Sequence, residues 1–315
     1  MNKRQFLKQS IYLTAGLPLG ILGCQTKNTA EQSHSAPAEV SHPSSTVQVP
    51  YLDTIGLQLW TVRNQLAADP QATLTAIAEL GYQQVELMDT RQAKDLLPIC
   101  KDLGLAVNSS FMLWTTLTDR WDLVPQEKEK MEFTEVLDQA SEAGLSHLVF
   151  GYLTPEERQS LDDYKKWADV LNEAALKAKQ HNLQMAYHNH NFEFAQLDGG
   201  VPFDVLSERL DAELFPFELD VFWAAIAGYD PVELLPRIKD RVKLLHLKDL
   251  KADTPVLQDN AGVPEEAFQE LGDGILPIKK LAEMGKEYGV DYCFVEQDFS
   301  PDPLESIKES IEFLG

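Results

Sequence analysis

Histidine and carboxylate side chains recur where four apolar segments of the sequence end. These four segment ends are Tyr187-His188-Asn189-His190, Glu218-Leu219-Asp220, Leu245-His246-Leu247-Lys248 and Val295-Glu296. Imidazole nitrogens and carboxylate oxygens are common protein ligands of Zn²⁺, Mn²⁺ and related divalent ions. Burying several such groups without a cation would be costly because each loses its hydration. The sequence therefore predicts a divalent-metal site, provided that the four ends meet.

Each of these residues, taken alone, has a simpler interpretation. A single histidine or aspartate at a strand end is more often a hydrogen-bonded structural group than a metal ligand. Side chains two apart on a strand share a face, so His188 and His190 point the same way. The same alternation separates Asp220 from Leu219. The occurrence on four consecutive strands is what favours a metal site.

The elements that must position these residues form a repeat that begins at Thr54. A predicted helix, a glycine and a short apolar run follow one another at Gly81, Gly104, Gly144 and Gly289. Glycine ends helices because it readily adopts the left-handed conformation. We predict eight strands, at residues 55–60, 83–88, 106–112, 147–153, 184–190, 216–223, 242–248 and 292–297. Their apolar character on both faces is typical of parallel strands covered by helices.

Eight strand–helix units over residues 53–315 predict a single α/β domain, a (β/α)₈ TIM barrel. Enzymes with this fold carry their chemistry at the carboxyl ends of the strands, where the four segment ends lie. A doubly wound open sheet is the main alternative. It is disfavoured because no glycine-rich phosphate loop follows the first strand.

The first 52 residues have a different character. Residues 1–23 join a basic start to an apolar run that is too short to span a bilayer comfortably, which is typical of a signal peptide. Ile21-Leu22-Gly23-Cys24 resembles a bacterial lipobox, so we expect Cys24 to be lipidated. Lys3-Arg4 resembles a twin-arginine signal with Lys in the first position, and the export route stays open. Residues 24–52 are polar and predict a flexible tether. We expect an exported lipoprotein, anchored on the periplasmic side of a membrane.

The charge of the chain excludes some functions. Residues from Cys24 onward carry 24 basic and 50 acidic side chains, a formal net charge of −26. Such a body repels phosphate backbones and anionic lipid surfaces, so we expect no nucleic-acid partner and membrane contact only through the lipid anchor. Three cysteines cannot form a disulfide framework. An oligomer is compatible with the sequence.

From residue 55 to its end the chain resembles the xylose-isomerase-like barrel family of sugar isomerases and epimerases. The matching segments are Gln58-Leu59-Trp60-Thr61-Val62-Arg63, Tyr187-His188-Asn189-His190, Leu219-Asp220-Val221-Phe222-Trp223, His246-Leu247-Lys248-Asp249, Leu271-Gly272-Asp273-Gly274 and Val295-Glu296. The resemblance implies one divalent ion, held by Asp220, His246, Glu296 and a residue of the fifth strand. We expect Mn²⁺, with Mg²⁺, Co²⁺ and Zn²⁺ as alternatives.

The fifth strand departs from the family pattern. His188 stands where the sugar isomerases and epimerases keep a glutamate. Either His188 or His190 would then be the fifth-strand ligand. Sugar dehydratases and eliminases on the same barrel also resemble this chain in having a Tyr-His-x-His strand.

The resemblance implies a metal-dependent sugar isomerase or epimerase that removes the proton next to the carbonyl of a sugar or keto-sugar. Glu296, His188 or His190 would take the proton, and Lys248 would help to hold the enediolate. Two alternatives stay open. One is a keto-sugar dehydratase, or an eliminase or hydratase of 3-keto-glycosides. The other, from a different class, is a sugar-binding lipoprotein without catalytic activity.

Further residues are candidates for contact with the sugar. Trp60, Trp114 and Trp223 lie near predicted strand ends, and flat aromatic faces suit sugar rings. Gln58 is a plausible partner for hydroxyl groups. Glu193 follows the fifth strand and would replace the missing glutamate there.

Overall fold

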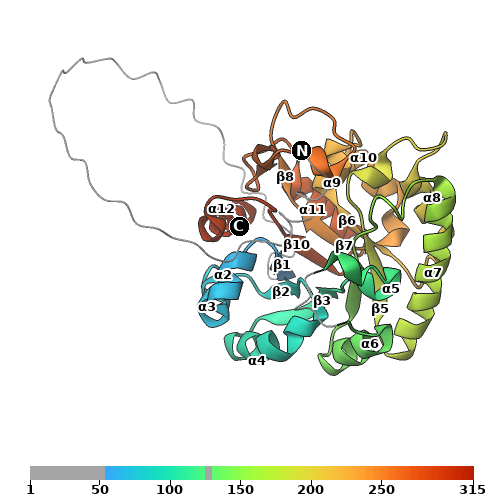
Figure 1. Cartoon of the computed structure of the whole chain (residues 1–315). Helices are drawn as coiled ribbons and strands as arrows, with labels where there is room; N and C mark the ends of the chain where they lie inside the picture. Colours follow the sequence, from blue (N-terminus) through green and yellow to red (C-terminus); the bar gives the residue numbers. More distant parts are fainter. Residues whose placement is uncertain (1–53, 125–129) are drawn as a thin grey trace, which may run out of the picture. The chain divides into compact units, whose positions relative to one another are not determined.

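The computed structural model describes residues 54–124 and 130–315. Eight parallel strands close into a barrel in the order β1-β10-β7-β6-β5-β4-β3-β2 (Figure 1). The strands are β1 (Ile55–Gln58), β2 (Gln84–Leu87), β3 (Ala106–Phe111), β4 (His147–Phe150), β5 (Gln184–His188), β6 (Phe217–Asp220), β7 (Val242–Leu247) and β10 (Tyr292–Val295). The predicted (β/α)₈ barrel is confirmed. The predicted signal peptide, Cys24 and the tether to residue 52 lie outside the described residues.

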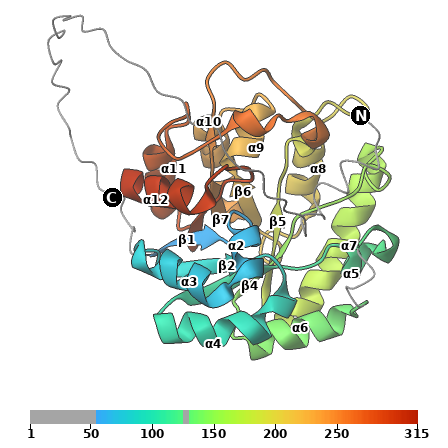
Figure 2. The same ribbon diagram turned by 60° about the vertical axis from the view of Figure 1, so that its left-hand side comes forward.

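Helices surround this barrel (Figures 1 and 2). The α-helices are α2 (Arg63–Ala68), α3 (Pro70–Glu79), α4 (Ala93–Leu103), α5 (Thr115–Thr118), α6 (Phe133–Glu142), α7 (Leu161–Gln180), α8 (Pro202–Arg209), α9 (Val221–Ile226), α10 (Pro231–Arg237), α11 (Ile278–Glu287) and α12 (Pro303–Leu314). The 3₁₀ turns are η2 (Thr90–Gln92), η3 (Trp121–Leu123), η4 (Phe192–Phe194), η5 (Lys239–Arg241), η6 (Asn260–Gly262) and η7 (Glu265–Ala267). Within the described ranges, no helix combines the length and apolar character needed to cross a bilayer.

Helix ends occur where the glycines predicted them. Gly104 closes α4 with a φ of 75°, and the three other glycines of the repeat also have positive φ. Asn182 takes the same left-handed conformation after α7, with a φ of 59°. The left-handed residue ends each helix, and the next strand of the barrel begins shortly after it.

An apolar layer inside the barrel lies beneath the predicted site. Val149, Ala186, Leu244 and Phe294 come from four different strands and pack together, with Phe111 at their edge. The Phe111 ring lies 5.2 Å from the His188 ring and 5.9 Å from the His246 ring, measured between centroids. The two imidazoles therefore contact an apolar layer, in which any charge is poorly screened.

The predicted sixth strand, 216–223, is too long. β6 ends at Asp220, and residues 221–226 form helix α9. The cause is local, because the Asp220 carboxylate accepts a hydrogen bond from the Trp223 backbone N–H at 3.0 Å and caps the helix. Trp223 is thus a helical residue and not a strand residue.

A second difference is a small antiparallel sheet, β8 (Asp249–Leu250) with β9 (Phe268–Gln269), that the sequence did not predict. The buried Asp249 carboxylate accepts hydrogen bonds from the backbone N–H groups of Leu250, Gly272 and Leu276, at 2.8 to 2.9 Å. One side chain therefore fixes the long connection between β7 and α11.

Replacing Gly274 with alanine should destabilise this connection. An added Cβ would lie 2.2 Å from Asp249 Oδ1 and 2.6 Å from the Leu250 carbonyl oxygen, so the backbone would have to shift. We expect a loss of about 1–3 kcal/mol in the free energy of unfolding. Thermal unfolding measures it against the matched control Gly262→Ala, where the new Cβ meets nothing within 4 Å. Equal melting temperatures for the two variants would contradict the account.

Candidate functional site

Buried ionisable side chains gather at the carboxyl ends of the strands. This ionisable cluster comprises Glu86, His188, Glu218, Asp220, His246, Lys248, Glu296 and Asp298. All but Asp298 are at most 6% exposed, and the Asp298 side chain is 16% exposed. The structure thus brings together the four predicted segment ends.

His246 is the centre of the cluster. It projects from β7, whose flanking leucines are buried on the other face. Its Nδ1 lies 2.7 Å from Glu296 Oε2, and its Nε2 lies 2.8 Å from Glu86 Oε2 and 3.3 Å from Glu218 Oε1. Burial alone would lower the pKa of His246, but the charges of Glu218 and Glu296 raise it well above its ordinary value. Without a metal ion, His246 is therefore a charged imidazolium between carboxylates.

Asp220 is held in place by the neighbouring strand. The Asn189 side chain accepts a hydrogen bond from Asp220 N at 3.0 Å and donates one to Asp220 O at 3.2 Å. While Oδ1 caps α9, Oδ2 accepts no hydrogen bond from the described residues. Burial raises the pKa of this carboxyl to about 6, against the opposing effect of Lys248.

These groups fit a divalent cation. Ligand atoms of Asp220, His246 and Glu296 lie within 4.8 Å of one another, and these three residues are called the metal trio below. When Nδ1 of His246 faces the ion, Nε2–H is held by Glu86, and such a carboxylate partner is typical of metal-binding histidines. The mixed nitrogen and oxygen donors suit Mn²⁺, Zn²⁺ and related ions.

Two other groups among residues 54–124 and 130–315 have the residue types to hold an ion. One group has ligand atoms of His188, Glu218 and His246 within 4.8 Å of one another. In this group the nitrogen of His246 nearest to Glu218 is Nε2. Glu270, Asp273 and Glu309 form a largely exposed acidic group with no nitrogen ligand. Of these three groups of described residues, only the metal trio consists entirely of residues that the sequence predicted as ligands.

His188, the predicted fifth-strand ligand, borders the metal trio. Its Nδ1 lies 2.9 Å from Glu218 Oε2, and its Nε2 lies 3.8 Å from Asp220 Oδ2. Burial, followed by the nearby charge of His246, lowers the pKa of His188 well below its ordinary value. His188 is thus neutral, and its ligation of the ion stays a prediction.

Lys248 is buried among three carboxylates. Its Nζ lies 3.1 Å from Asp220 Oδ2 and 2.8 Å from both Glu296 Oε2 and Asp298 Oδ2. Burial lowers the pKa of Lys248, but these carboxylates raise it well above its ordinary value overall. Burial raises the pKa of Glu296 as well, yet Lys248 and His246 bring it to about 2. Both members of this ion pair are charged.

Three members of the ionisable cluster were missed in the sequence: Glu86, Glu218 and Asp298. Glu218 and Asp298 each lie two residues from a predicted site residue, so strand alternation could have found them. Glu86 lies in β2, which contains no predicted site residue, and so gives no such signal.

Gln58, which was predicted to bind substrate, makes its side-chain hydrogen bonds within the protein. Its Nε2 donates to Glu86 Oε2 at 2.7 Å, and its Oε1 accepts from Trp60 N at 3.0 Å. The structure thus shows Gln58 supporting Glu86. Trp60 itself stacks under the Arg63 guanidinium, 4.4 Å from the ring centroid.

Aromatic side chains line the β5 side of the cluster. The His190 ring lies 5.2 Å from Trp223, 5.3 Å from Phe192 and 5.8 Å from Tyr152, and Tyr152 contacts Trp114 at 5.6 Å. Two buried atoms here, His190 Nδ1 and Trp223 Nε1, have no hydrogen-bond partner in the described part of the chain. This aromatic wall brings together three of the predicted site residues.

Glu193 does not point into the ionisable cluster. Its Oε1 accepts from the Tyr187 hydroxyl and its Oε2 from His190 N, each at 2.8 Å. Both oxygens thus hold the turn after β5. Burial raises the pKa of this carboxyl to about 7.

This raised pKa predicts a pH-dependent stability. The unfolded chain releases the proton near the ordinary value of 4.5, and the folded chain near 7. The stability it provides is therefore complete below pH 4.5 and is lost as pH rises through 7, by up to about 3 kcal/mol. Glu193→Gln should remove this loss, since a glutamine amide can also accept from His190 N. Urea unfolding at pH 5 and pH 8 tests it, with the exposed Glu213→Gln as control. An unchanged pH dependence in Glu193→Gln would refute it.

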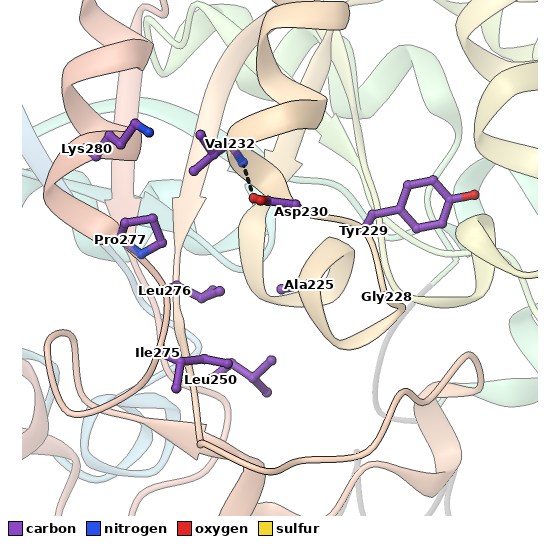
Figure 3. Close-up of a pocket in the computed structure, with 10 residues that line it drawn as sticks. All are labelled: Ala225, Gly228, Tyr229, Asp230, Val232, Leu250, Ile275, Leu276, Pro277 and Lys280. Atoms are coloured by element: carbon purple, nitrogen blue, oxygen red, sulfur yellow. Dashed lines mark hydrogen bonds between the residues drawn. The ribbon is translucent and has the colours of Figure 1, made fainter.

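A separate surface pocket of about 520 Å³ lies beside α9 and α10 (Figure 3). Its lining consists of Ala225, Gly228, Tyr229, Asp230, Val232, Leu250, Ile275, Leu276, Pro277 and Lys280. None of these belongs to the ionisable cluster, and the Asp230 carboxylate accepts from Val232 N at 2.8 Å. The pocket carries no arrangement of groups that points to chemistry.

Comparison with known proteins agrees with this fold. A model of the family described as xylose isomerase-like TIM barrel matches residues 74–315. The inosose dehydratase of Geobacillus kaustophilus is 29% identical over 234 residues, which cover 67% of this chain and 75% of that protein. The match to the inosose dehydratase of Lacticaseibacillus casei, 25% identical, covers 49% of this chain and only 54% of that protein.

Solved structures share the fold. A sugar phosphate isomerase/epimerase from Parabacteroides distasonis superimposes with a TM-score of 0.67 at 22% identity, covering 82% of this chain and 96% of that one. The IOLI protein with a bound zinc atom gives a TM-score of 0.62 at 15% identity, covering 82% and 95%.

Proposed function

We propose that this chain, which belongs to the xylose isomerase-like TIM barrel family, is a metal-dependent dehydratase of cyclic keto-polyols or keto-sugars. The reaction would remove the proton next to a carbonyl and expel the hydroxyl group from the following carbon. The observation that carries the proposal is the combination of the metal trio with the neutral imidazole of His190, whose Nδ1 has no partner among the described residues. The similarity to inosose dehydratases supports the substrate class.

In the proposed reaction the metal trio, His190 and Lys248 have different roles. A divalent ion bound by the metal trio would polarise the carbonyl group and acidify the neighbouring C–H bond. Burial lowers the pKa of His190 to about 3, so the imidazole is neutral and its Nδ1 can accept the proton. The resulting imidazolium is a strong acid, which suits return of that proton to the departing hydroxyl to form water. The Lys248 ammonium stabilises negative charge on the substrate oxygen.

The β5 side distinguishes this proposal from an epimerase. Epimerisation needs one group to remove a proton and a second to return one to the opposite face of the same carbon. Glu193, the candidate for a second carboxylate, has both oxygens bound to Tyr187 and His190. Elimination needs only a single base that turns into an acid. An isomerase or epimerase is the second candidate, since a structural neighbour bears that name.

Incubation with Mn²⁺ in D₂O would distinguish the candidates. The panel holds inososes, 3-keto-glycosides and simple ketoses, followed by NMR and mass spectrometry. We expect a product lighter than an inosose by one water. An isomer of the substrate that has gained one carbon-bound deuterium would favour an epimerase instead. Binding without turnover of any compound would favour the sugar-binding lipoprotein.

We also propose that the protein works outside the inner membrane, because the sequence around Cys24 resembles a lipobox. Fractionation of cells that express the full chain tests this. The wild type should appear in the membrane fraction, with a lipid mass on Cys24. Cys24→Ala should lose both properties, and membrane association of that variant would contradict the proposal.

A further inference from the structure

Lys248 contacts the same oxygen atoms that a metal ion would use. Its Nζ lies 2.8 Å from Glu296 Oε2 and 3.1 Å from Asp220 Oδ2. These two oxygens also face His246 Nδ1, at 2.7 and 3.9 Å. The ammonium therefore lies against two of the three groups of the metal trio.

An ammonium and a divalent ion that contact the same two oxygens would repel each other. Two like charges this close repel each other strongly where little water lies between them, and the double charge of a divalent ion doubles that repulsion. Lys248 is only 2% exposed, so water screens little of it. Binding of the ion must move Nζ away from Asp220 and Glu296.

The backbone limits how Lys248 can move. Leu247 ends β7, and Asp249 begins β8 with its carboxylate bound to three backbone N–H groups. Rotation of the side chain is therefore the available movement. Asp298, at 2.8 Å from Nζ and outside the metal trio, is the carboxylate that can keep the ammonium.

We propose that Lys248 is the resident cation of the metal-free site and that a divalent ion displaces its ammonium toward Asp298. This inference rests on the metal binding proposed above. In the metal-free protein, Lys248 stabilises Asp220 and Glu296 in the positions that the ion requires. Uptake of the ion then releases the ammonium toward the mouth, where it can meet substrate oxygen. Lys248 thus links metal uptake to assembly of the site.

Mn²⁺ affinity, measured by chelator competition on the full chain, tests the displacement. Lys248→Met removes the competing cation, so its Mn²⁺ dissociation constant should fall at least about tenfold. Asp298→Asn removes the carboxylate to which the displaced ammonium would move. In the wild-type background it should raise the Mn²⁺ dissociation constant about tenfold. In the Lys248→Met background the Asp298→Asn change should have less than about a third of that effect, because no ammonium needs a destination. Lys243→Met, the same change at the other end of β7, is the matched control.

The outcomes separate this inference from the proposed function. No Mn²⁺ binding by the wild type would overturn both. Wild-type binding with equal or weaker binding by Lys248→Met would overturn the displacement alone. Equal effects of Asp298→Asn in both backgrounds would also overturn it, since simple charge attraction would then explain them. If Lys248→Met folds only with metal present, the Asp298→Asn result and a crystal structure with Mn²⁺ decide. Nζ should lie on Asp298 and away from Asp220 in that structure.

Discussion

Asp220→Asn is expected to abolish metal binding and to lower turnover by roughly 10²- to 10³-fold or more, without destabilising the barrel. The amide keeps an oxygen to cap α9 through Trp223 N, but it removes the anionic oxygen that faces His246 and Lys248. Burial raises the pKa of this carboxyl to about 6, which means that the folded state favours its neutral form. The variant should therefore be as stable at pH 7 as the metal-free wild type, or more stable.

Stability and metal affinity have to be measured together for this variant. Asp220→Ala is the matched control, because it loses the helix cap as well and should be about 1 kcal/mol less stable than Asp220→Asn. Elemental analysis and thermal unfolding give both quantities. An Asp220→Asn protein that binds Mn²⁺ with wild-type affinity would show that Asp220 is no ligand.

Glu86→Gln should weaken metal binding about 10- to 100-fold although Glu86 does not belong to the metal trio. The Glu86 carboxylate accepts hydrogen bonds from Gln58 Nε2 and from Ser109 Oγ, and it faces His246 Nε2. A glutamine whose NH₂ group takes the position of Oε2 would turn a donor toward Gln58 Nε2 and His246 Nε2. Transfer of the His246 proton from Nε2 to Nδ1 relieves that conflict, but it blocks the nitrogen that faces the ion.

The histidine tautomer makes this prediction specific. ¹⁵N NMR should show His246 protonated at Nε2 in the metal-loaded wild type and at Nδ1 in Glu86→Gln. Ser109→Ala removes one donor to Glu86 and leaves the carboxylate, so its metal affinity should change little. The idea fails if Glu86→Gln binds Mn²⁺ as tightly as Ser109→Ala does.

Much of the fold could be predicted from local signals. Each observed barrel strand starts within one residue of its predicted start, because helix-ending residues such as Gly104 and Asn182 mark the entry to the strand. The strands end one to three residues earlier than predicted. At β6 the reason is the side chain of Asp220, which starts a helix where the apolar run Val221-Phe222-Trp223 continues. Apolar character alone does not distinguish these two outcomes.

That the three residues of the metal trio lie close together was predictable from the strand ends. Asp220, His246 and Glu296 meet because parallel strands of a barrel bring their carboxyl ends to one rim. What holds them was not predictable, since it depends on contacts between residues far apart in the sequence. Glu86 meets His246 across 160 positions. The contacts of Lys248 with Asp298 and Glu296 likewise join residues about 50 positions apart.

The central claim, a divalent ion that serves keto-sugar chemistry at the metal trio, has one direct test. The full-length protein is purified without added metal, treated with a chelator, and assayed on an inosose before and after Mn²⁺ is restored. We predict that one divalent ion per chain is found in the active protein, that chelation stops the loss of water, and that Mn²⁺ restores it. Undiminished turnover in chelated protein that contains no metal would contradict the account.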